Sequence, residues 1–129
     1  MIRVKVAVGI ILRDNSVFVA LRNSKQHQGG LWEFPGGKCE ASESAEVALV
    51  RELKEECGIS ITECDFFKTI SHDYGDKSVE LFFYKVTGFD GEPDSKEGQE
   101  VRWVAVSDLV SYDFPEANKP IVVALMAHY

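Results

Sequence analysis

Residues 37–59 read GKCEASESAEVALVRELKEECGI, and this stretch decides the fold because it contains the clearest helix of the chain. The spacing of its apolar residues predicts an amphipathic helix over residues 44–57, with the apolar face packed inward. Ser42 or Ser44 can cap the first turn, and Gly58 stands where a left-handed residue commonly ends a helix. The apolar residues recur at intervals of three, three and four, at Val47, Val50, Leu53 and Cys57.

Three glutamates of this helix form the first candidate functional group. Glu52 and Glu56 are four residues apart on one face, and Glu55 lies three beyond Glu52. Like charges at this spacing destabilise an isolated helix by about 0.2–0.5 kcal/mol per pair. Arg51 can relieve Glu55, whereas Glu52 and Glu56 have no such partner within the helix. A divalent cation such as Mg²⁺ would remove the repulsion, and a solvated acidic face is the alternative.

A glycine turn precedes the helix. Residues 31–38 read LWEFPGGK, so an apolar, strand-like segment leads through Pro35 into Gly36 and Gly37. Glycine lets a ligand approach the backbone closely. The carbonyl of Gly36 could therefore complete a metal shell, and Lys38 is near enough in sequence to meet a phosphate. Most Gly-Gly turns are only turns, so the function of this one depends on the helix that follows.

Charge restricts the class of ligand. The chain has a formal net charge of −7 and a sequence pI near 4.9. Such a protein repels polyanions, which argues against a nucleic-acid groove, although a small phosphorylated ligand can bind where metal ions bridge it to carboxylates. The apolar N-terminus is interrupted by Arg3 and Lys5 and indicates a buried strand rather than a signal peptide, and we expect no membrane partner.

Length and cysteine content indicate an ordinary globular domain. The 129 residues, 45% of them hydrophobic, predict one domain over residues 1–129. Cys39, Cys57 and Cys64 are odd in number and form no CxxC pair, which argues against a disulfide or zinc framework. We therefore expect a cytoplasmic protein, and a monomer.

The rest of the chain predicts a mixed sheet. A turn at residues 13–15 joins the first two strands, Ser107 can cap a short helical turn, and Ile121–His128 has the apolar side of a last helix. This order of elements predicts an α+β fold in which a mixed β-sheet is sandwiched between α-helices. The strands are expected at residues 4–12, 16–22, 66–71, 79–87 and 101–106.

Three further positions allow both a functional and an ordinary interpretation. Glu97 lies in the polar, acidic loop of residues 90–100, where a solvated side chain is the ordinary expectation. Asn118 comes just before the last helix and could either cap it or contact a ligand. His27, in a glycine-containing loop, could touch a ligand.

The stretch quoted first is similar to the signature of a known family. It spells G-x5-E-x7-R-E-L-x-E-E-x-G followed by an aliphatic residue, from Gly37 to Ile59, and so resembles the Nudix hydrolases without a departure. Residues 31–38, 91–93, 96–99 and 113–118 also look like the bacterial Nudix hydrolases that destroy 8-oxo-dGTP. The resemblance covers essentially the whole chain and implies the Nudix fold.

The resemblance also implies a reaction and a set of residues. The reaction is Mg²⁺-dependent hydrolysis of a nucleoside triphosphate to a monophosphate and pyrophosphate, by attack of water at the β-phosphorus, with Mn²⁺ as a substitute metal. Glu52 or Glu97 would help to deprotonate the water, and Glu43 and Arg51 would order the loop and helix. The implied metal ligands are the Gly36 carbonyl, Glu52, Glu55, Glu56 and Glu97. The implied substrate contacts are Arg22, His27, Glu33, Phe34, Pro35, Gly36, Lys38 and Asn118.

Substrate choice follows from hydrogen bonding. Guanine has an acceptor at N7, whereas its 8-oxo form carries a hydrogen there, so a carbonyl near Phe34 would accept from the damaged base alone. Asn118 can pair with the six-position oxygen and the neighbouring edge. Two positions depart from the resemblance: Lys77 stands where arginine is expected, and Trp32 where an aliphatic is expected.

Two alternative functions stay open. A related Nudix pyrophosphohydrolase could prefer pyrimidine triphosphates such as CTP or 5-methyl-dCTP, because those enzymes share the segment around Trp32. A non-catalytic Nudix domain could sense a nucleotide, but this class is expected to lose carboxylates that are all present here.

Overall fold

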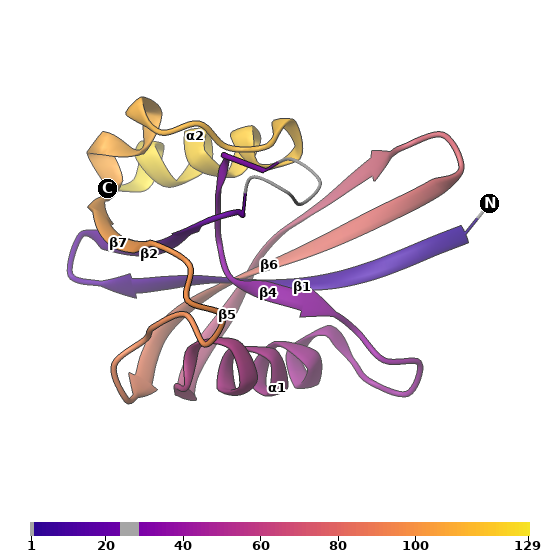
Figure 1. Cartoon of the computed structure of the whole chain (residues 1–129), viewed down its shortest axis with the longest axis horizontal. Helices are drawn as coiled ribbons and strands as arrows, with labels where there is room; N and C mark the ends of the chain where they lie inside the picture. The colour runs from indigo at the N-terminus through magenta and orange to yellow at the C-terminus, as the bar shows by residue number, and fades with distance from the viewer. Residues whose placement is uncertain (1, 24–28) are drawn as a thin grey trace.

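The computed structural model describes residues 2–23 and 29–129, and it places a mixed sheet between two helical layers (Figure 1). Helix α1 (Ala45–Cys57) covers one face of the sheet, and helix α2 (Lys119–His128) covers the other. Two short 3-10 helices, η1 (Val106–Ser111) and η2 (Glu116–Asn118), precede α2. The predicted α+β sandwich is confirmed.

The sheet is built around two long central strands. Strand β1 pairs parallel with β6 and antiparallel with β2 and β4. Strand β6 pairs antiparallel with β5, and β7 pairs antiparallel with β2. The main path runs in the order β3-β2-β1-β6-β5. The bounds are β1 Ile2–Arg13, β2 Ser16–Leu21, β3 Trp32–Glu33, β4 Gly36–Lys38, β5 Ser60–Asp73, β6 Lys77–Asp90 and β7 Val101–Ala105.

The predicted strands are all present, and most extend beyond their predicted ends. The largest difference is in β5, which runs over Ser60–Asp73 where only residues 66–71 were expected. Its burial pattern is mostly exposed and intermediate, so it lacks the regular apolar alternation that marks a strand in a sequence. Pairing along β6 nevertheless extends it from Ser60 to Asp73, with register shifts along the way.

Alternation along β1 supplies apolar side chains to both layers, because successive strand residues point to opposite faces. Ile10 belongs to the core cluster that contains Leu125 of α2. Ile11 belongs to the other cluster, which contains Leu49 and Leu53 of α1. These two isoleucines of β1 and the three leucines of the helices are all fully buried, at 0% exposure. Strand β1 therefore joins the two halves of the core.

The ends of α1 agree with the sequence prediction. Ser44, rather than Ser42, is the N-cap, and its hydroxyl accepts a hydrogen bond from the Val47 backbone N–H at 3.2 Å. Gly58 adopts the left-handed conformation, with φ of 74°, and its N–H returns to carbonyls of the last turn. By contrast, η1 begins at Val106, so Ser107 lies inside that helix and the prediction that it caps the turn was wrong.

The buried face of α1 differs in part from the predicted one. Leu53 and Cys57 are buried as expected, but Val47 and Val50 are 56% and 43% exposed, so the prediction that they face inward was wrong. Leu49 is fully buried instead, which makes the inward row Leu49, Leu53 and Cys57. Rows spaced by three and by four fit the helical period about equally well, and tertiary packing chooses between them.

Packing beneath β1 explains that choice. A Cβ at Gly9 would lie 2.7 Å from Cδ1 of Leu53 and 3.3 Å from Cδ1 of Leu49, so the glycine leaves room for this row of leucines.

No helix among residues 2–23 and 29–129 combines the length and the apolar character needed to cross a bilayer.

Candidate active site

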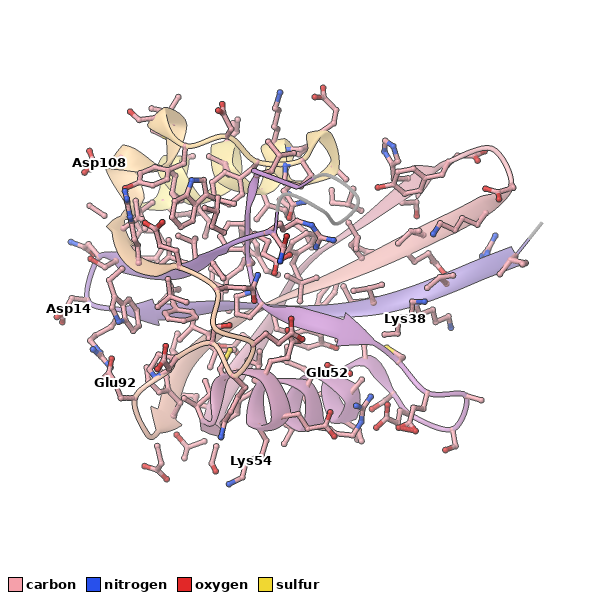
Figure 2. The ribbon with its side chains drawn as sticks, in the orientation of Figure 1. Asp14, Lys38, Glu52, Lys54, Glu92 and Asp108 are labelled. Carbon is pink, nitrogen blue, oxygen red and sulfur yellow. The ribbon has the colours of Figure 1, made fainter. Side chains whose placement is uncertain are left out.

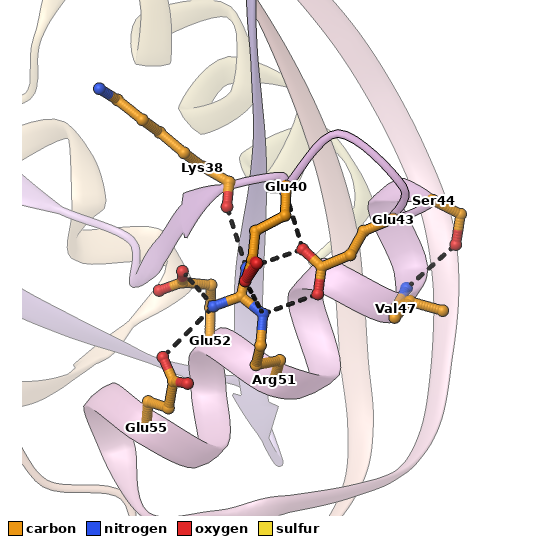
Figure 3. A network of polar contacts seen from close by, with 8 residues as sticks. All are labelled: Lys38, Glu40, Glu43, Ser44, Val47, Arg51, Glu52 and Glu55. Atoms are coloured by element: carbon orange, nitrogen blue, oxygen red, sulfur yellow. Dashed lines mark hydrogen bonds and ion pairs between the residues drawn. The ribbon is translucent and has the colours of Figure 1, made fainter.

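Arg51 organises the junction between the glycine turn and α1 (Figure 3). Its guanidinium donates to both carboxylate oxygens of Glu43, from Nε to Oε2 at 2.7 Å and from Nη2 to Oε1 at 2.8 Å. Nη2 also donates to the Lys38 carbonyl at 3.1 Å, and Nη1 donates to Glu52 Oε1 at 2.8 Å and to Glu55 Oε2 at 3.3 Å. One arginine thus ties the turn, the loop and two helix carboxylates together.

This network modifies the expectation for the helix charges. Glu55 pairs with Arg51 as predicted. Glu52 was expected to have no partner within the helix, but it also pairs with Arg51, the residue directly before it in the chain. The hydrogen bonds from Arg51, with a further one from the backbone of Glu40, hold the pKa of Glu43 down at about 2. Glu43 is therefore ionised throughout the physiological range and keeps Arg51 in place.

Glu52 lies against the glycine turn. A Cβ at Gly37 would stand 2.2 Å from Oε2 of Glu52, a separation that real side chains do not show. A glycine at this position therefore leaves the space that the carboxylate fills. In Figure 2, Glu52 lies between α1 and β4, whereas Lys54 points away from the sheet.

Glu56 is the most strongly perturbed acid of the site. Its Oε2 atom is buried and has no hydrogen-bond partner among the described residues. Burial, followed by the negative charges of Glu52 and Glu33, raises the pKa of Glu56 to about 8. A carboxylate with one buried oxygen that lacks a donor, close to other carboxylates, is chemically suited to a hard divalent cation. The donor set therefore fits the metal that the sequence predicts.

The acidic loop of residues 91–100 reaches this cluster through the end of α1. The backbone N–H groups of Asp94 and Lys96 donate to the carbonyls of Cys57 at 3.2 Å and Glu56 at 2.9 Å, which satisfies two acceptors of the helix terminus. Glu97 follows directly, and its charge contributes to the raised pKa of Glu56. Glu97 therefore lies within electrostatic range of Glu56, and its role as a metal ligand stays a prediction.

The carboxylates are not yet arranged as a finished metal site. Among residues 2–23 and 29–129, no three acidic, histidine or cysteine side chains surround one point that could hold an ion. Arg51 is bonded to both Glu52 and Glu55. A metal bound by these groups would therefore compete with Arg51 for their oxygens.

A cavity of about 330 Å³ lies at the glycine turn, where Gly36 and Lys38 form part of its wall. Phe34 lies in its wall and stacks on Phe114 with ring centroids 5.0 Å apart. Asn118 also lines the cavity, and at the N-cap position of α2 its side chain makes no capping bond to the described helix. Six of the predicted contact residues meet in this wall: Arg22, Glu33, Phe34, Gly36, Lys38 and Asn118.

One predicted substrate contact among the described residues, Pro35, lies outside the cavity wall. Pro35 is buried, and its carbonyl accepts from the Gly9 N–H at 2.8 Å. Pro35 is therefore a structural link between the turn and β1 rather than part of the cavity wall. His27 falls outside the described residues.

Other residues that were not predicted from the sequence also line the cavity. Val6 and Val8, which share one face of β1 with Val4, form an apolar wall, and Tyr74 lies at the tip of the β5–β6 hairpin. Lys77, where the resemblance leads to an expected arginine, lines the cavity from the start of β6. The alternating valines of β1 were a detectable signal, whereas Tyr74 itself carried none.

A family model for the NUDIX domain matches residues 7–124, which include the carboxylates of this site and the cavity wall apart from Val4 and Val6. This chain belongs to the Nudix family. The stretch from Gly37 to Ile59 is therefore its Nudix box, and the protein is a Nudix hydrolase with a nucleotide substrate.

Individual Nudix relatives agree over nearly the full length. The 8-oxo-dGTP diphosphatase of Escherichia coli (strain K12) is 39% identical over 124 residues, which cover 95% of this chain and 96% of the relative. The CTP pyrophosphohydrolase of the same strain is 35% identical, covering 96% and 92%. Both functional classes considered from the sequence are thus represented among close relatives.

Solved Nudix structures confirm the fold. MutT, from work on Aliivibrio salmonicida and Vibrio cholerae, superposes with a TM-score of 0.90 at 43% identity, covering 98% of this chain and 99% of the other. The E. coli ORF135 protein superposes with a TM-score of 0.88 at 35% identity, covering 98% and 91%.

Proposed function

We propose that this Nudix hydrolase converts 8-oxo-dGTP to 8-oxo-dGMP and pyrophosphate in a divalent-metal-dependent reaction, and so prevents replication errors. The main support is the position of Asn118, whose side-chain amide makes no capping bond and lines the same cavity as Phe34 and the glycine turn. An amide supplies a donor and an acceptor together, which suits the edge of a purine. The E. coli relative that is named for this activity supports the same substrate.

We assign the metal chemistry to three glutamates of the Nudix box and to two groups outside it. Glu52, Glu55, Glu56 and Glu97, with the Gly36 carbonyl, would hold Mg²⁺, or Mn²⁺ in its place. A bound ion of this kind neutralises the triphosphate and makes water a better nucleophile. The unpartnered Glu56 oxygen supports this assignment most directly.

The protein residues have separate roles in this proposal. Glu52 or Glu97 accepts the proton of the water that attacks the β-phosphorus, and Arg51 orients Glu52 through its hydrogen bond. Glu43 holds Arg51 from the other side. Lys38 and Arg22 are cations at the cavity and would meet the phosphates or the sugar.

Selectivity is assigned to the cavity. A backbone carbonyl near Phe34 would accept the hydrogen at N7 of the oxidised base and repel the lone pair of normal guanine. Asn118 would pair with the six-position oxygen and with the neighbouring edge, where N7 carries a hydrogen only in the oxidised base. A site built around such a hydrogen bond can discriminate by about 10⁴–10⁵ against a ligand that leaves it unpaired.

The second candidate function is a pyrimidine triphosphate pyrophosphohydrolase, which the E. coli CTP pyrophosphohydrolase relative favours. The deciding experiment compares kcat/KM for 8-oxo-dGTP, dGTP, CTP and 5-methyl-dCTP with Mg²⁺ and with EDTA. A preference of several orders of magnitude for 8-oxo-dGTP is expected. Higher kcat/KM with CTP or 5-methyl-dCTP would show that the substrate is a pyrimidine triphosphate. No turnover of any nucleotide would overturn the proposed reaction.

A further inference from the structure

The side chain of Gln99 bridges the cavity and the acidic loop. Its Nε2 donates to the Leu21 carbonyl at 3.0 Å and to Glu33 Oε2 at 3.2 Å, and its Oε1 accepts from Ser95 Oγ at 3.1 Å. Both ends of the amide are therefore used, and only one orientation satisfies all three partners. Such a fully bonded amide has a fixed position.

Glu33 is the residue through which this bridge reaches the site. Its other oxygen, Oε1, pairs with Arg22, and its side chain is 20% exposed at the wall of the cavity. Glu33 thus joins the cavity wall and its Arg22 partner to the amide of Gln99.

The opposite end of the bridge sets the loop that carries Glu97. The hydroxyl of Ser95 accepts from the backbone N–H of Glu97 at 3.3 Å and from that of Gln99 at 3.2 Å. Ser95 in turn is held by the Gln99 side chain. A path of hydrogen bonds therefore runs from Glu33 through Gln99 and Ser95 to Glu97.

We propose that Gln99 is a positioning residue that couples the nucleotide cavity to the metal-binding loop, by orienting Glu33 and by holding Glu97 beside the box carboxylates. The inference rests on the proposed metal-dependent function. It extends that function by giving a route for coupling. A nucleotide bound in the cavity would shift Glu33, and the hydrogen bonds of Gln99 and Ser95 would pass this shift to Glu97. Gln99 itself contacts neither the phosphates nor the metal in this proposal.

A purely structural role for Gln99 is the competing explanation, and the chain contains a matched control. The same loop is also anchored at Glu92, which accepts from Arg13 at 2.8 Å and from Trp103 Nε1 at 3.4 Å. Glu92 has no contact with Glu33 or Ser95 among the described interactions. The variant Glu92→Gln therefore loosens the loop without disturbing the bridge.

The first test measures Mn²⁺ affinity of the nucleotide-free protein by electron paramagnetic resonance, together with kcat and KM. Loss of a hydrogen bond to a charged group is worth about tenfold. Gln99→Ala should therefore weaken Mn²⁺ binding and lower kcat by about tenfold, with a smaller change in KM. Glu92→Gln should change both within about twofold. Equal effects of the two variants, or unchanged Mn²⁺ affinity in Gln99→Ala, would overturn the proposal.

The second test exchanges donor and acceptor. Gln99→Glu places a carboxylate against Glu33 and should weaken Mn²⁺ binding more than Gln99→Ala does. Adding Glu33→Gln restores a donor–acceptor pair and should recover part of that loss, whereas a structural role predicts that the two losses add. Additive losses would contradict the proposal.

Failure of the coupling is distinguishable from failure of the proposed function. Wild-type protein that hydrolyses no nucleotide removes the function, and the Mn²⁺ affinities still show whether Gln99 positions the loop. Wild-type protein that is active, with Gln99→Ala normal in metal affinity and kcat, removes the coupling alone.

Discussion

The guanidinium of Arg51 holds the carboxylate of Glu43 in a two-point contact, with donor–acceptor distances of 2.7 and 2.8 Å. The two residues are eight positions apart, one in the loop before α1 and one in the middle of that helix. This pair fixes the glycine turn against the helix, and the remaining nitrogen of Arg51 is aimed at Glu52. The geometry of the box carboxylates Glu52 and Glu55 therefore depends on Arg51, which would act behind any metal they hold.

Acid sensitivity should follow from this pair. The pKa of Glu43 is lowered from its ordinary 4.5 to about 2, so its contribution to stability is present above pH 4.5 and is lost as pH falls from 4.5 towards 2. Glu43→Gln should lower Tm at pH 7 and flatten the fall of Tm over that acid range. Glu116→Gln, at an exposed acid paired only with Lys119, is the control and should leave the Tm profile unchanged. A Glu43→Gln profile parallel to wild type would contradict the assignment.

Glu56 should produce the opposite pH dependence in the metal-free protein. Its pKa is raised from 4.5 to about 8, so the folded state keeps a proton that the unfolded state loses, and stability falls as pH rises through this range. Glu56→Gln should therefore raise Tm at pH 8 in EDTA. Mg²⁺ should raise the Tm of wild type at this pH but not that of the variant.

The same substitution should be severe for catalysis. Changes to groups behind metal ligands already cost about 10–100-fold, so Glu56→Gln should reduce kcat/KM by more than about a hundredfold. Measurement of turnover over a Mg²⁺ titration checks this. Near-normal turnover with an unaltered Mg²⁺ requirement would sink the metal assignment for Glu56.

Asn118→Ala should separate base recognition from helix capping. Because the Asn118 side chain makes no capping bond to α2, its loss should change the free energy of unfolding by less than about 0.5 kcal/mol. Selectivity for 8-oxo-dGTP over dGTP should fall by at least about tenfold, the value of one hydrogen bond to a base. Asn15→Ala, in the exposed turn at residues 13–15, is the matched control. Retained selectivity together with a loss of about 1 kcal/mol would show that Asn118 is only a cap.

Gly37→Ala should damage the site more than the fold. The added methyl would meet the Glu52 carboxylate at 2.2 Å and must displace it. Because a carboxylate at the end of a side chain can move, a modest fall in Tm is expected together with a large loss of kcat. Thermal unfolding and a Mg²⁺ titration on the same variant separate these effects, and full activity would show that Glu52 does not need this position.

Several features of the site could be read from local sequence. The Ser44 cap, the left-handed Gly58 and the register of the box glutamates all depend on residues within about four positions of each other. The strands were predictable wherever apolar residues alternate. Strand β5 was predicted short because its ends lack that alternation and are held by pairing to β6.

The Nudix box, the helix that carries Glu52, Glu55 and Glu56, and a negative charge that favours binding of a cation could all be read from the sequence alone. Only the tertiary structure decided that α1 buries Leu49 instead of Val47 and Val50, because space beneath Gly9 selects the row of side chains. It also decided that Gln99 meets Glu33, 66 residues away in the chain. The physical reason is range: helical periodicity and capping act between near neighbours, whereas these contacts depend on how a packed core brings distant segments together.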